Sequence, residues 1–172
     1  GVMVGSNTAI VDNPTLTSRG RHAPLSGRQP LRIVLDSSLK IPTDSNIFNS
    51  ESKTFVATAQ STQLKNISKQ HIIKKFGINE GKLNLDEILK TLGEMDIKSI
   101  LVEGGNQLIG DFFDKNLVDK IEAFIAPKII GGEFSKSPIG GEGAITMKDV
   151  QNLSNVSITE FDDDILITGY VK

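Results

Sequence analysis

Residues 99–106, SILVEGGN, decide the fold class of this sequence. An apolar run of strand length ends at Glu103, two glycines follow, and Asn106 opens a helical pattern. Glycines at a strand end let the backbone approach a ligand, and the exposed N–H groups of a following helix attract anions such as a pyrophosphate. The segment alone predicts a phosphate cradle or a tight turn without a ligand. Glu103 favours the cradle, because a carboxylate at the carboxyl end of a buried strand belongs in a cleft, where α/β sheets bind ligands.

Short apolar runs typical of strands recur on both sides of this segment. They cover residues 2–4, 33–35, 55–57, 100–102 and 121–125. A helix over 107–115 separates the last two runs, which predicts a strand–helix–strand unit. A second helix begins after Asn84, because Glu87 stands three residues further on as in a capping box. Between residues 46 and 79 the pattern is weaker, and the apolar residues at 67, 72, 73 and 76 indicate another helix.

The last thirty or so residues change character. Residues 156–161 and 165–171 alternate in β fashion around an acidic turn at 162–164, which predicts a closing antiparallel hairpin. The whole pattern predicts an α/β fold with a mostly parallel central sheet and a C-terminal antiparallel hairpin. We expect one domain over residues 1–172. Because the opening residues, GVMVGSN, already lie within a strand pattern, we also expect the domain's first strand to be missing from this chain.

Composition excludes several classes of function. The chain of 172 residues is 38% hydrophobic and 23% charged, with a formal net charge of −2. Its lysines and arginines are dispersed, so it lacks the basic surface of a nucleic-acid-binding protein. The absence of cysteine excludes disulfides, a thiolate nucleophile and Cys-ligated zinc within this chain, and we assign no metal site. No apolar run reaches the ~20 residues that span a bilayer, and we expect a cytoplasmic protein that does not bind membranes.

A second candidate for chemistry is the segment VGSNTAIVDNPTLTSR, residues 4–19. If Asn7 caps a short helix, Thr8 and Asp12 lie on one face, and Pro14 ends the helix. Arg19 follows an extended stretch, where a guanidinium can bind a phosphate through paired hydrogen bonds. Taken alone, the segment favours a helix cap, a structural Asp12 and a surface Arg19 over a ligand site.

Other polar residues give weaker signals. Asp36 and Ser37 follow a strand and either contact a ligand or organise the turn. The glycine pair at 131–132 is typical of a turn, and we assign no role to the isolated His22 and His71. Neither the dinucleotide fingerprint G-x-G-x-x-G nor the P-loop pattern occurs, which disfavours a standard Rossmann domain.

Five motifs together resemble one family. VGSNT, DNPTLTSR, RIVLDSS, ILVEGG and PKIIGG stand in the order and spacing of the riboflavin-biosynthesis reductase domain, and the resemblance runs from Val4 to about Gly132. That domain is the C-terminal half of the bifunctional pyrimidine deaminase and reductase of bacteria. The resemblance implies a dihydrofolate-reductase-like three-layer fold, usually a homodimer. It also implies that NADPH donates hydride to the ribose C1 carbon of 5-amino-6-(5-phosphoribosylamino)uracil and converts the ribosyl group to the ribityl form.

The resemblance also implies roles for individual residues. NADPH would contact Thr8, Asp12, Ser37 and the run Gly105, Asn106, Gln107, Leu108, Ile109, Gly110 and Asp111. The phosphorylated pyrimidine would contact Leu16, Arg19 and Glu103. Glu103 and Asp12 are the catalytic candidates for handling the proton. Neither His-x-Glu nor Pro-Cys-x-x-Cys occurs, so a zinc deaminase domain fused to this chain, or working with it, would supply the deamination.

Two alternatives remain. One is a dihydrofolate-type reductase of the same fold, which Arg19 disfavours because it suits a phosphorylated substrate. The other is a non-catalytic nucleotide-binding dimerisation module that has lost turnover. Lys40 and Lys128 are the candidates for recognising the 2′-phosphate that distinguishes NADPH from NADH.

Overall fold

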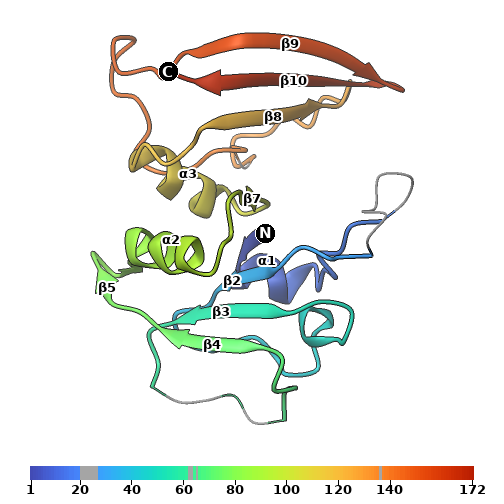
Figure 1. Ribbon diagram of the computed structural model, residues 1–172. Helices are drawn as coiled ribbons and strands as arrows, with labels where there is room; N and C mark the ends of the chain where they lie inside the picture. Colours follow the sequence, from blue (N-terminus) through green and yellow to red (C-terminus); the bar gives the residue numbers. More distant parts are fainter. Residues whose placement is uncertain (20–26, 62–63, 65, 136) are drawn as a thin grey trace. The chain divides into compact units, whose positions relative to one another are not determined.

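The structure, a computed structural model, describes residues 1–19, 27–61, 64, 66–135 and 137–172 (Figure 1). It divides into two compact units, Gly1–Gly105 and Asn106–Lys172. The expectation of a single domain stays a prediction. No helix among the described residues is long and apolar enough to cross a membrane.

A five-stranded sheet forms the centre of the first unit. Its order is β4-β3-β2-β1-β7, and every neighbouring pair is parallel. The strands are β1 (Val2–Gly5), β2 (Arg32–Leu35), β3 (Thr54–Thr58), β4 (Ile72–Lys75) and β7 (Leu101–Val102). The helical elements are α1 (Ser6–Val11), the 3-10 helix η2 (Asn46–Phe48) and α2 (Leu85–Glu94), and a small hairpin joins β5 (Ile78–Asn79) to β6 (Lys82–Leu83).

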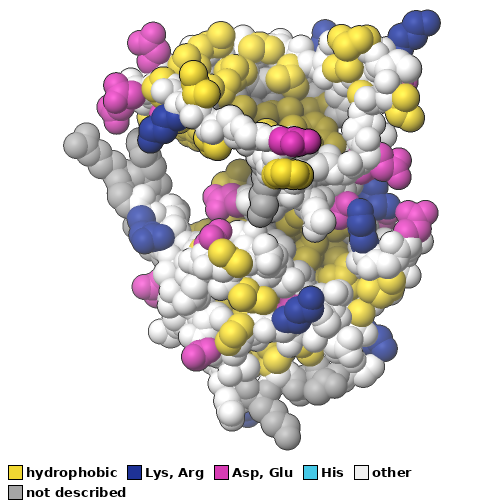
Figure 2. All heavy atoms as spheres, turned by 180° about the vertical axis from the view of Figure 1, so that it is seen from behind, with side chains coloured by type: hydrophobic (Ala, Val, Ile, Leu, Met, Phe, Trp, Pro, Cys, Tyr) yellow, Lys and Arg dark blue, Asp and Glu magenta, His cyan; other side chains and the backbone are white. Residues whose placement is uncertain are grey.

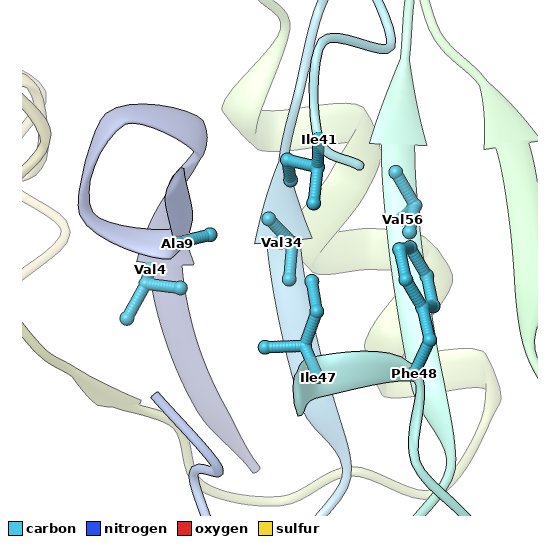
Figure 3. Close-up of a cluster of buried hydrophobic side chains, with 7 residues drawn as sticks. All are labelled: Val4, Ala9, Val34, Ile41, Ile47, Phe48 and Val56. Carbon is cyan, nitrogen blue, oxygen red and sulfur yellow. The ribbon is translucent and has the colours of Figure 1, made fainter. Parts of the chain in front are cut away.

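The register of the sheet explains the two apolar layers around it. Val4, Val34 and Val56 are aligned across β1, β2 and β3. Together with residues from α1 and η2 they form one buried cluster, whose members are Val4, Ala9, Val34, Ile41, Ile47, Phe48 and Val56 (Figure 3). Successive strand residues face opposite sides of a sheet, so their neighbours Met3, Ile33 and Phe55 line the other face. That face is covered by α2 (Figure 3), whose Leu85, Ile88 and Leu92 are buried. The predicted three-layer α/β fold is confirmed.

A fully buried arginine ties η2 to the sheet. Arg32, at the start of β2, has 0% of its surface exposed. Its Nη1 donates hydrogen bonds to the carbonyls of Ile47 (2.9 Å), Asn49 (3.3 Å) and Ser52 (3.2 Å), and Nη2 donates to Asn49 Oδ1 at 2.7 Å. Burying a charge is costly unless hydrogen bonds compensate it. Arg32 is therefore compensated by the backbone around η2, which it holds in place.

His71 belongs to the same buried region. Its Nδ1 accepts a hydrogen bond from the Thr54 N–H at 3.1 Å, and its Nε2 lies 3.0 Å from the carbonyl of Phe48, to which it can only donate. These partners select the neutral ring with the proton on Nε2. Burial lowers the pKa of His71, while the Phe48 carbonyl opposes this shift and the positive charge of Arg32 adds to it.

The second unit is built on antiparallel pairing. Its strands are β8 (Lys120–Ile125), β9 (Leu153–Phe161) and β10 (Asp164–Val171), in the order β8-β10-β9, and its helix is α3 (Asn106–Asp114). Apolar side chains remain exposed on this sheet (Figure 2), and they comprise Phe124, Ile125, Val156, Ile158, Phe161, Ile165 and Tyr170. Such a surface marks an interaction site more often than a solvated face.

The structure confirms most of the predicted elements and corrects three. The helices at α2 and α3 and the closing hairpin β9–β10 are confirmed, and the Asn84 side chain caps α2 by accepting from the Asp86 and Glu87 N–H groups. The helix expected among residues 67–76 is wrong, because the edge strand β4 occupies 72–75. Adjacent β-branched isoleucines favour a strand, and its lysines suit an edge.

The other corrections concern α1 and β8. Gly5 rather than Asn7 is the N-cap of α1, and it makes no side-chain capping bond. The predicted strand–helix–strand unit is wrong, because β8 pairs antiparallel with β10 and not with β7. Local sequence pattern could not predict the pairing of β8, because it does not specify which strand is the partner.

Candidate active site

The first unit contains a pocket lined by residues from both predicted motifs. Its volume is about 420 Å³, and its lining comprises Val2, Pro14, Leu16, Thr17, Ser18, Arg19, Leu101 and Glu103. The pocket therefore brings together Leu16, Arg19 and Glu103, the residues predicted to contact the substrate. Apolar side chains form part of its wall, with a cation and a carboxylate at the same site, a combination that suits a polar ligand with an anionic group.

An unusual backbone path carries Leu16 and Arg19 to this pocket. Asp12 is the C-cap of α1, and its N–H donates to the Thr8 carbonyl at 3.0 Å. Asn13 then has a φ of 41°, in the left-handed region that ends many helices, and Pro14 prevents the helix from continuing. Leu16 has a φ of 47°, which is uncommon for a bulky residue. Strain of this kind costs about 1–3 kcal/mol and concentrates at functional sites.

Arg19 is oriented by its own loop. Its Nη2 donates to Thr15 Oγ1 at 2.8 Å, and that hydroxyl lies 3.3 Å from Thr17 Oγ1. The guanidinium has further donors for a ligand, because it carries five N–H groups in a planar fork. A phosphate bound there would receive charge-assisted hydrogen bonds, which are stronger than neutral ones.

Glu103 directly follows β7. Its backbone N–H donates to the Met3 carbonyl at 2.9 Å, so the parallel pairing of β7 with β1 fixes its position. The side chain is exposed and lines the pocket. A carboxylate so placed can accept hydrogen bonds from a ligand or exchange a proton with it.

Thr8 and the glycine turn after Glu103 lie against each other. Gly104 and Gly105 have φ values of 62° and 73°, a conformation that favours glycine. A Cβ atom on Gly104 would lie 3.0 Å from Thr8 Cγ2 and 3.3 Å from Thr8 Oγ1. A Cβ on Gly105 would lie 3.4 Å from the same hydroxyl. The turn thus leaves a backbone surface beside Thr8 that side chains would fill, as a phosphate cradle requires.

Ser37 follows β2, and the end of β3 holds it in place. Its carbonyl accepts hydrogen bonds from the Ala59 N–H (3.0 Å), Thr58 Oγ1 (3.3 Å) and Gln60 Nε2 (3.4 Å), while its side chain is exposed. The preceding Asp36 is buried, and its Oδ2 accepts from the Ile41 N–H at 3.0 Å. Asp36 therefore organises the turn, and the coenzyme contact of Ser37 stays a prediction.

The rest of the predicted phosphate-binding run lies in the second unit, in α3. Leu108 and Gly110 are buried there, whereas Gln107 is exposed. A Cβ on Gly110 would approach the backbone of Gly140 and Gly141 to 2.3 Å, so glycine is required at 110 for packing. The coenzyme roles of Asn106, Gln107, Leu108, Ile109, Gly110 and Asp111, like that of Asp12 in the first unit, stay predictions.

Three residues without a predicted role at the site, Gly131, Gly132 and His71, belong to a turn or to a buried hydrogen-bond network. Gly131 and Gly132 have positive φ values in an exposed turn, where the Ser135 hydroxyl donates to the Gly131 carbonyl. His71 is a structural residue of the buried network, and His22 lies outside the described residues. Sequence reasoning missed Gln29 and Asn46, whose side-chain amides bond residues 18 and 13 of the pocket segment. No local motif marks them, because their partners are distant in sequence.

Comparisons with known proteins identify the family of this chain. The family model described as the RibD C-terminal domain matches residues 1–167. The riboflavin biosynthesis protein RibD of Bacillus amyloliquefaciens is 33% identical over 174 residues, which cover 99% of this chain and 46% of that protein. The 2,5-diamino-6-ribosylamino-4(3H)-pyrimidinone 5′-phosphate reductase of Aquifex aeolicus is 33% identical over 159 residues, covering 89% of this chain and 68% of that protein.

A solved structure shares the fold. RibD of Acinetobacter baumannii superposes with a TM-score of 0.84 at 20% identity, covering 100% of this chain and 47% of that one. The chain thus spans about half the length of the RibD proteins that it matches. Because the family model covers nearly the whole sequence, the predicted family is confirmed: this chain belongs to the RibD C-terminal domain family, the reductase domains of riboflavin biosynthesis.

Proposed function

We propose that this chain uses NADPH to reduce the ribosyl group of 5-amino-6-(5-phosphoribosylamino)uracil to the ribityl form. The observation that carries the proposal is the pocket in which Leu16, Arg19 and Glu103 meet. A cation and a carboxylate around one partly apolar cavity match a substrate that combines a phosphate, a polyhydroxylated chain and a planar ring.

Each pocket residue has a distinct task in this proposal. Arg19 binds the substrate phosphate, which lies far from the reacting carbon and so provides binding energy for orientation. Leu16 packs against the apolar part of the substrate. Glu103 contacts the ribosyl group close to the reacting C1 carbon, and we propose that it, or Asp12, handles the proton that accompanies hydride transfer.

The coenzyme site is proposed from the cradle beside Thr8. The turn at Gly104 and Gly105 leaves room that a Cβ would occupy, which suits the close approach of a pyrophosphate. Thr8, Asp12 and Ser37, and the run from Gly105 to Asp111, would hold the coenzyme. When bound, NADPH would supply the hydride, and the protein would supply binding, orientation and the proton.

Three further parts of the proposal concern the setting of the enzyme. We propose a cytoplasmic homodimer, and the exposed apolar face of β8–β10 supports association with a second copy. A zinc deaminase domain, fused or separate, would supply the deaminated pyrimidine, since the RibD relatives are about twice as long as the part this chain covers.

The decisive test is NADPH oxidation by the purified chain with three separate candidate substrates and a buffer blank. The substrates are the deaminated ribosylaminouracil phosphate, the diamino-ribosylaminopyrimidinone phosphate named for the Aquifex aeolicus relative, and dihydrofolate. Oxidation with the deaminated compound at the highest kcat/KM supports the proposal. A higher kcat/KM with the diamino compound would contradict the proposed substrate and identify the diamino compound as the substrate instead. Oxidation only with dihydrofolate, or NADPH binding without turnover, would contradict the proposal and favour the dihydrofolate-type or non-catalytic alternative.

A further inference from the structure

The segment that carries Leu16 and Arg19 has little backbone structure of its own. Within the described residues, no backbone–backbone hydrogen bond involves residues 13–19, and the last one before them joins the Asp12 N–H to Thr8. A segment without such bonds opens easily. Two residues in it nevertheless hold unusual left-handed conformations, Asn13 and Leu16. Other contacts must therefore fix the path of this segment.

The first such contact is made by Asn46, the opening residue of η2. Its backbone N–H donates to Asn13 Oδ1 at 2.8 Å, and its Nδ2 donates to the Asn13 carbonyl at 2.8 Å. The next residue, Ile47, is buried, and its carbonyl accepts from the guanidinium of the buried Arg32 and from the Thr54 hydroxyl. Asn46 thus extends from a rigid part of the core.

The second contact is made by Gln29 at the other end of the segment. Its Oε1 accepts from the Ser18 N–H at 2.8 Å, and its Nε2 donates to the Ser18 carbonyl at 3.3 Å. The adjacent Pro30 carbonyl accepts from Ser52 Oγ at 2.6 Å, and the Leu31 carbonyl accepts from the Val2 N–H at 2.9 Å. Gln29 therefore also extends from fixed backbone, because Pro30 and Leu31 lead directly into β2.

Between these two contacts, Leu16 packs against the buried cluster shown in Figure 3. The segment is therefore attached at Asn13, Leu16 and Ser18, and Arg19 follows directly after the last attachment. A primary amide can donate and accept at once, so Gln29 satisfies both backbone groups of Ser18. An aliphatic side chain at this position could do neither.

We propose that Gln29 and Asn46 are positioning residues, which hold the segment 13–19 so that Leu16 and Arg19 meet the phosphorylated substrate. The inference rests on the proposed function, because it concerns binding of that substrate. Neither residue lines the pocket, so both act through the segment and not by contact with the substrate.

The test compares Gln29→Ala and Asn46→Ala with Asn84→Ala. Asn84 is a matched control in the same unit, because its side-chain amide, like that of Gln29, makes two hydrogen bonds to backbone groups, but it caps α2 instead. Gln29→Ala removes both bonds to Ser18, whereas Asn46→Ala removes only the Nδ2 bond and keeps the backbone donor. We expect KM for the pyrimidine phosphate to rise about tenfold in Gln29→Ala and less in Asn46→Ala, as loss of hydrogen bonds implies.

Two further measurements separate positioning from general destabilisation. The Kd for NADPH should stay within about twofold of wild type in all variants, and amide hydrogen exchange should accelerate over residues 13–19 only in the Gln29 and Asn46 variants. Gln29→Glu, which keeps an acceptor for the Ser18 N–H but loses the donor, should give an intermediate KM.

The possible outcomes distinguish the hypotheses. Unchanged exchange at residues 13–19 would overturn the inference, as would faster exchange with an unchanged KM for the pyrimidine phosphate. An equal rise of KM in Asn84→Ala would also overturn it, because the effect would then follow stability alone. If wild-type protein does not oxidise NADPH with the pyrimidine phosphate, the proposed function fails, and that result appears in the activity assay whatever the exchange data show.

Discussion

Substituting Gly104 by alanine tests the contact between the glycine turn and Thr8. A Cβ at this position meets Thr8 Cγ2 at 3.0 Å and Oγ1 at 3.3 Å, closer than most such contacts, so Thr8 has to move by a few tenths of an ångström. The left-handed backbone, with φ of 62°, adds about 1–2 kcal/mol for alanine. The crowding adds roughly 1 kcal/mol more, at the lower end of overpacking costs. We therefore expect Gly104→Ala to lower the free energy of unfolding by about 2–3 kcal/mol.

Gly81 provides the matched control for this experiment. Its φ of 79° resembles that of Gly104, but a Cβ there has nothing within 4 Å. Gly81→Ala should therefore show only the backbone cost, about 1–2 kcal/mol. Urea unfolding measures both free energies. The double variant Gly104→Ala/Thr8→Ser lacks the Cγ2 methyl group and should recover part of the difference between them.

The same variants report on the coenzyme site. If Thr8 and the glycine turn form the cradle, Gly104→Ala should weaken NADPH binding about tenfold, the value of one lost hydrogen bond, while Gly81→Ala leaves it unchanged. Titration calorimetry measures both dissociation constants. Equal unfolding free energies for the two alanine variants would refute the contact argument. Unchanged NADPH affinity in a destabilised Gly104→Ala would place the coenzyme elsewhere.

Four other predictions follow from the structure. Arg19→Ala should raise KM for the phosphorylated pyrimidine about ten- to a hundredfold, the range for bonds to charged groups, and equal weakening of NADPH binding in calorimetry would argue against a phosphate role. Glu103→Gln should lower kcat at least tenfold while the circular dichroism spectrum and unfolding midpoint stay unchanged, and full turnover would exclude Glu103 from proton transfer. Burial lowers the pKa of His71 below its unfolded value of about 6.5, so its stabilising contribution is complete above that pH and declines as the pH falls toward the folded pKa. The urea midpoint should therefore decrease as the pH is lowered from 7.5 to 5.5, and a similar decrease in His71→Gln would assign the effect to another group. Ile158, with 68% of its surface exposed on β9, should tolerate Ile158→Asp without unfolding. If the proposed homodimer forms through this face, the wild type should sediment as a dimer and the variant as a monomer; a variant that still sediments as a dimer would place the interface elsewhere.

Much of the fold could be predicted from local pattern. The strands around residues 2–4, 33–35 and 55–57 are apolar throughout because a parallel sheet covered on both faces buries most of their residues, and this gives a strong signal. The helix α2 combines a capping asparagine with a buried stripe, and the closing hairpin alternates around an acidic turn. These features depend on residues that are close in sequence, so local pattern is sufficient to predict them.

The errors arose where the partner is distant in sequence. The edge strand β4 has two isoleucines followed by two lysines, a run too short to separate strand from helix, and only its pairing with β3 decides. The pairing of β8 with β10 instead of β7 likewise depends on the last residues of the chain. The N-cap of α1 is Gly5 and not the predicted Asn7, and a difference of two residues is usual when helix ends are assigned.

The candidate site was predicted in part for the same reasons. Two motifs that are far apart in sequence predicted the chemistry of Leu16, Arg19 and Glu103, and the structure places these residues around one pocket. The strained backbone at Leu16 and the amide contacts of Gln29 and Asn46 could not be predicted, since glutamine and asparagine at those positions are also ordinary surface residues. Only the folded chain shows which backbone groups they satisfy.

The place of β1 in the sheet has a consequence for how the protein is made. This strand lies between β2 and β7, so Val2 pairs with Arg32 on one side and with Leu101 on the other. During synthesis, one edge of β1 has no partner until β7 has left the ribosome, although β2 is already available. Contacts between such distant residues slow folding, and an open apolar strand edge is prone to wrong pairing meanwhile. Protection of β1 from wrong pairing during synthesis therefore begins only when β7 is available to cover its second edge.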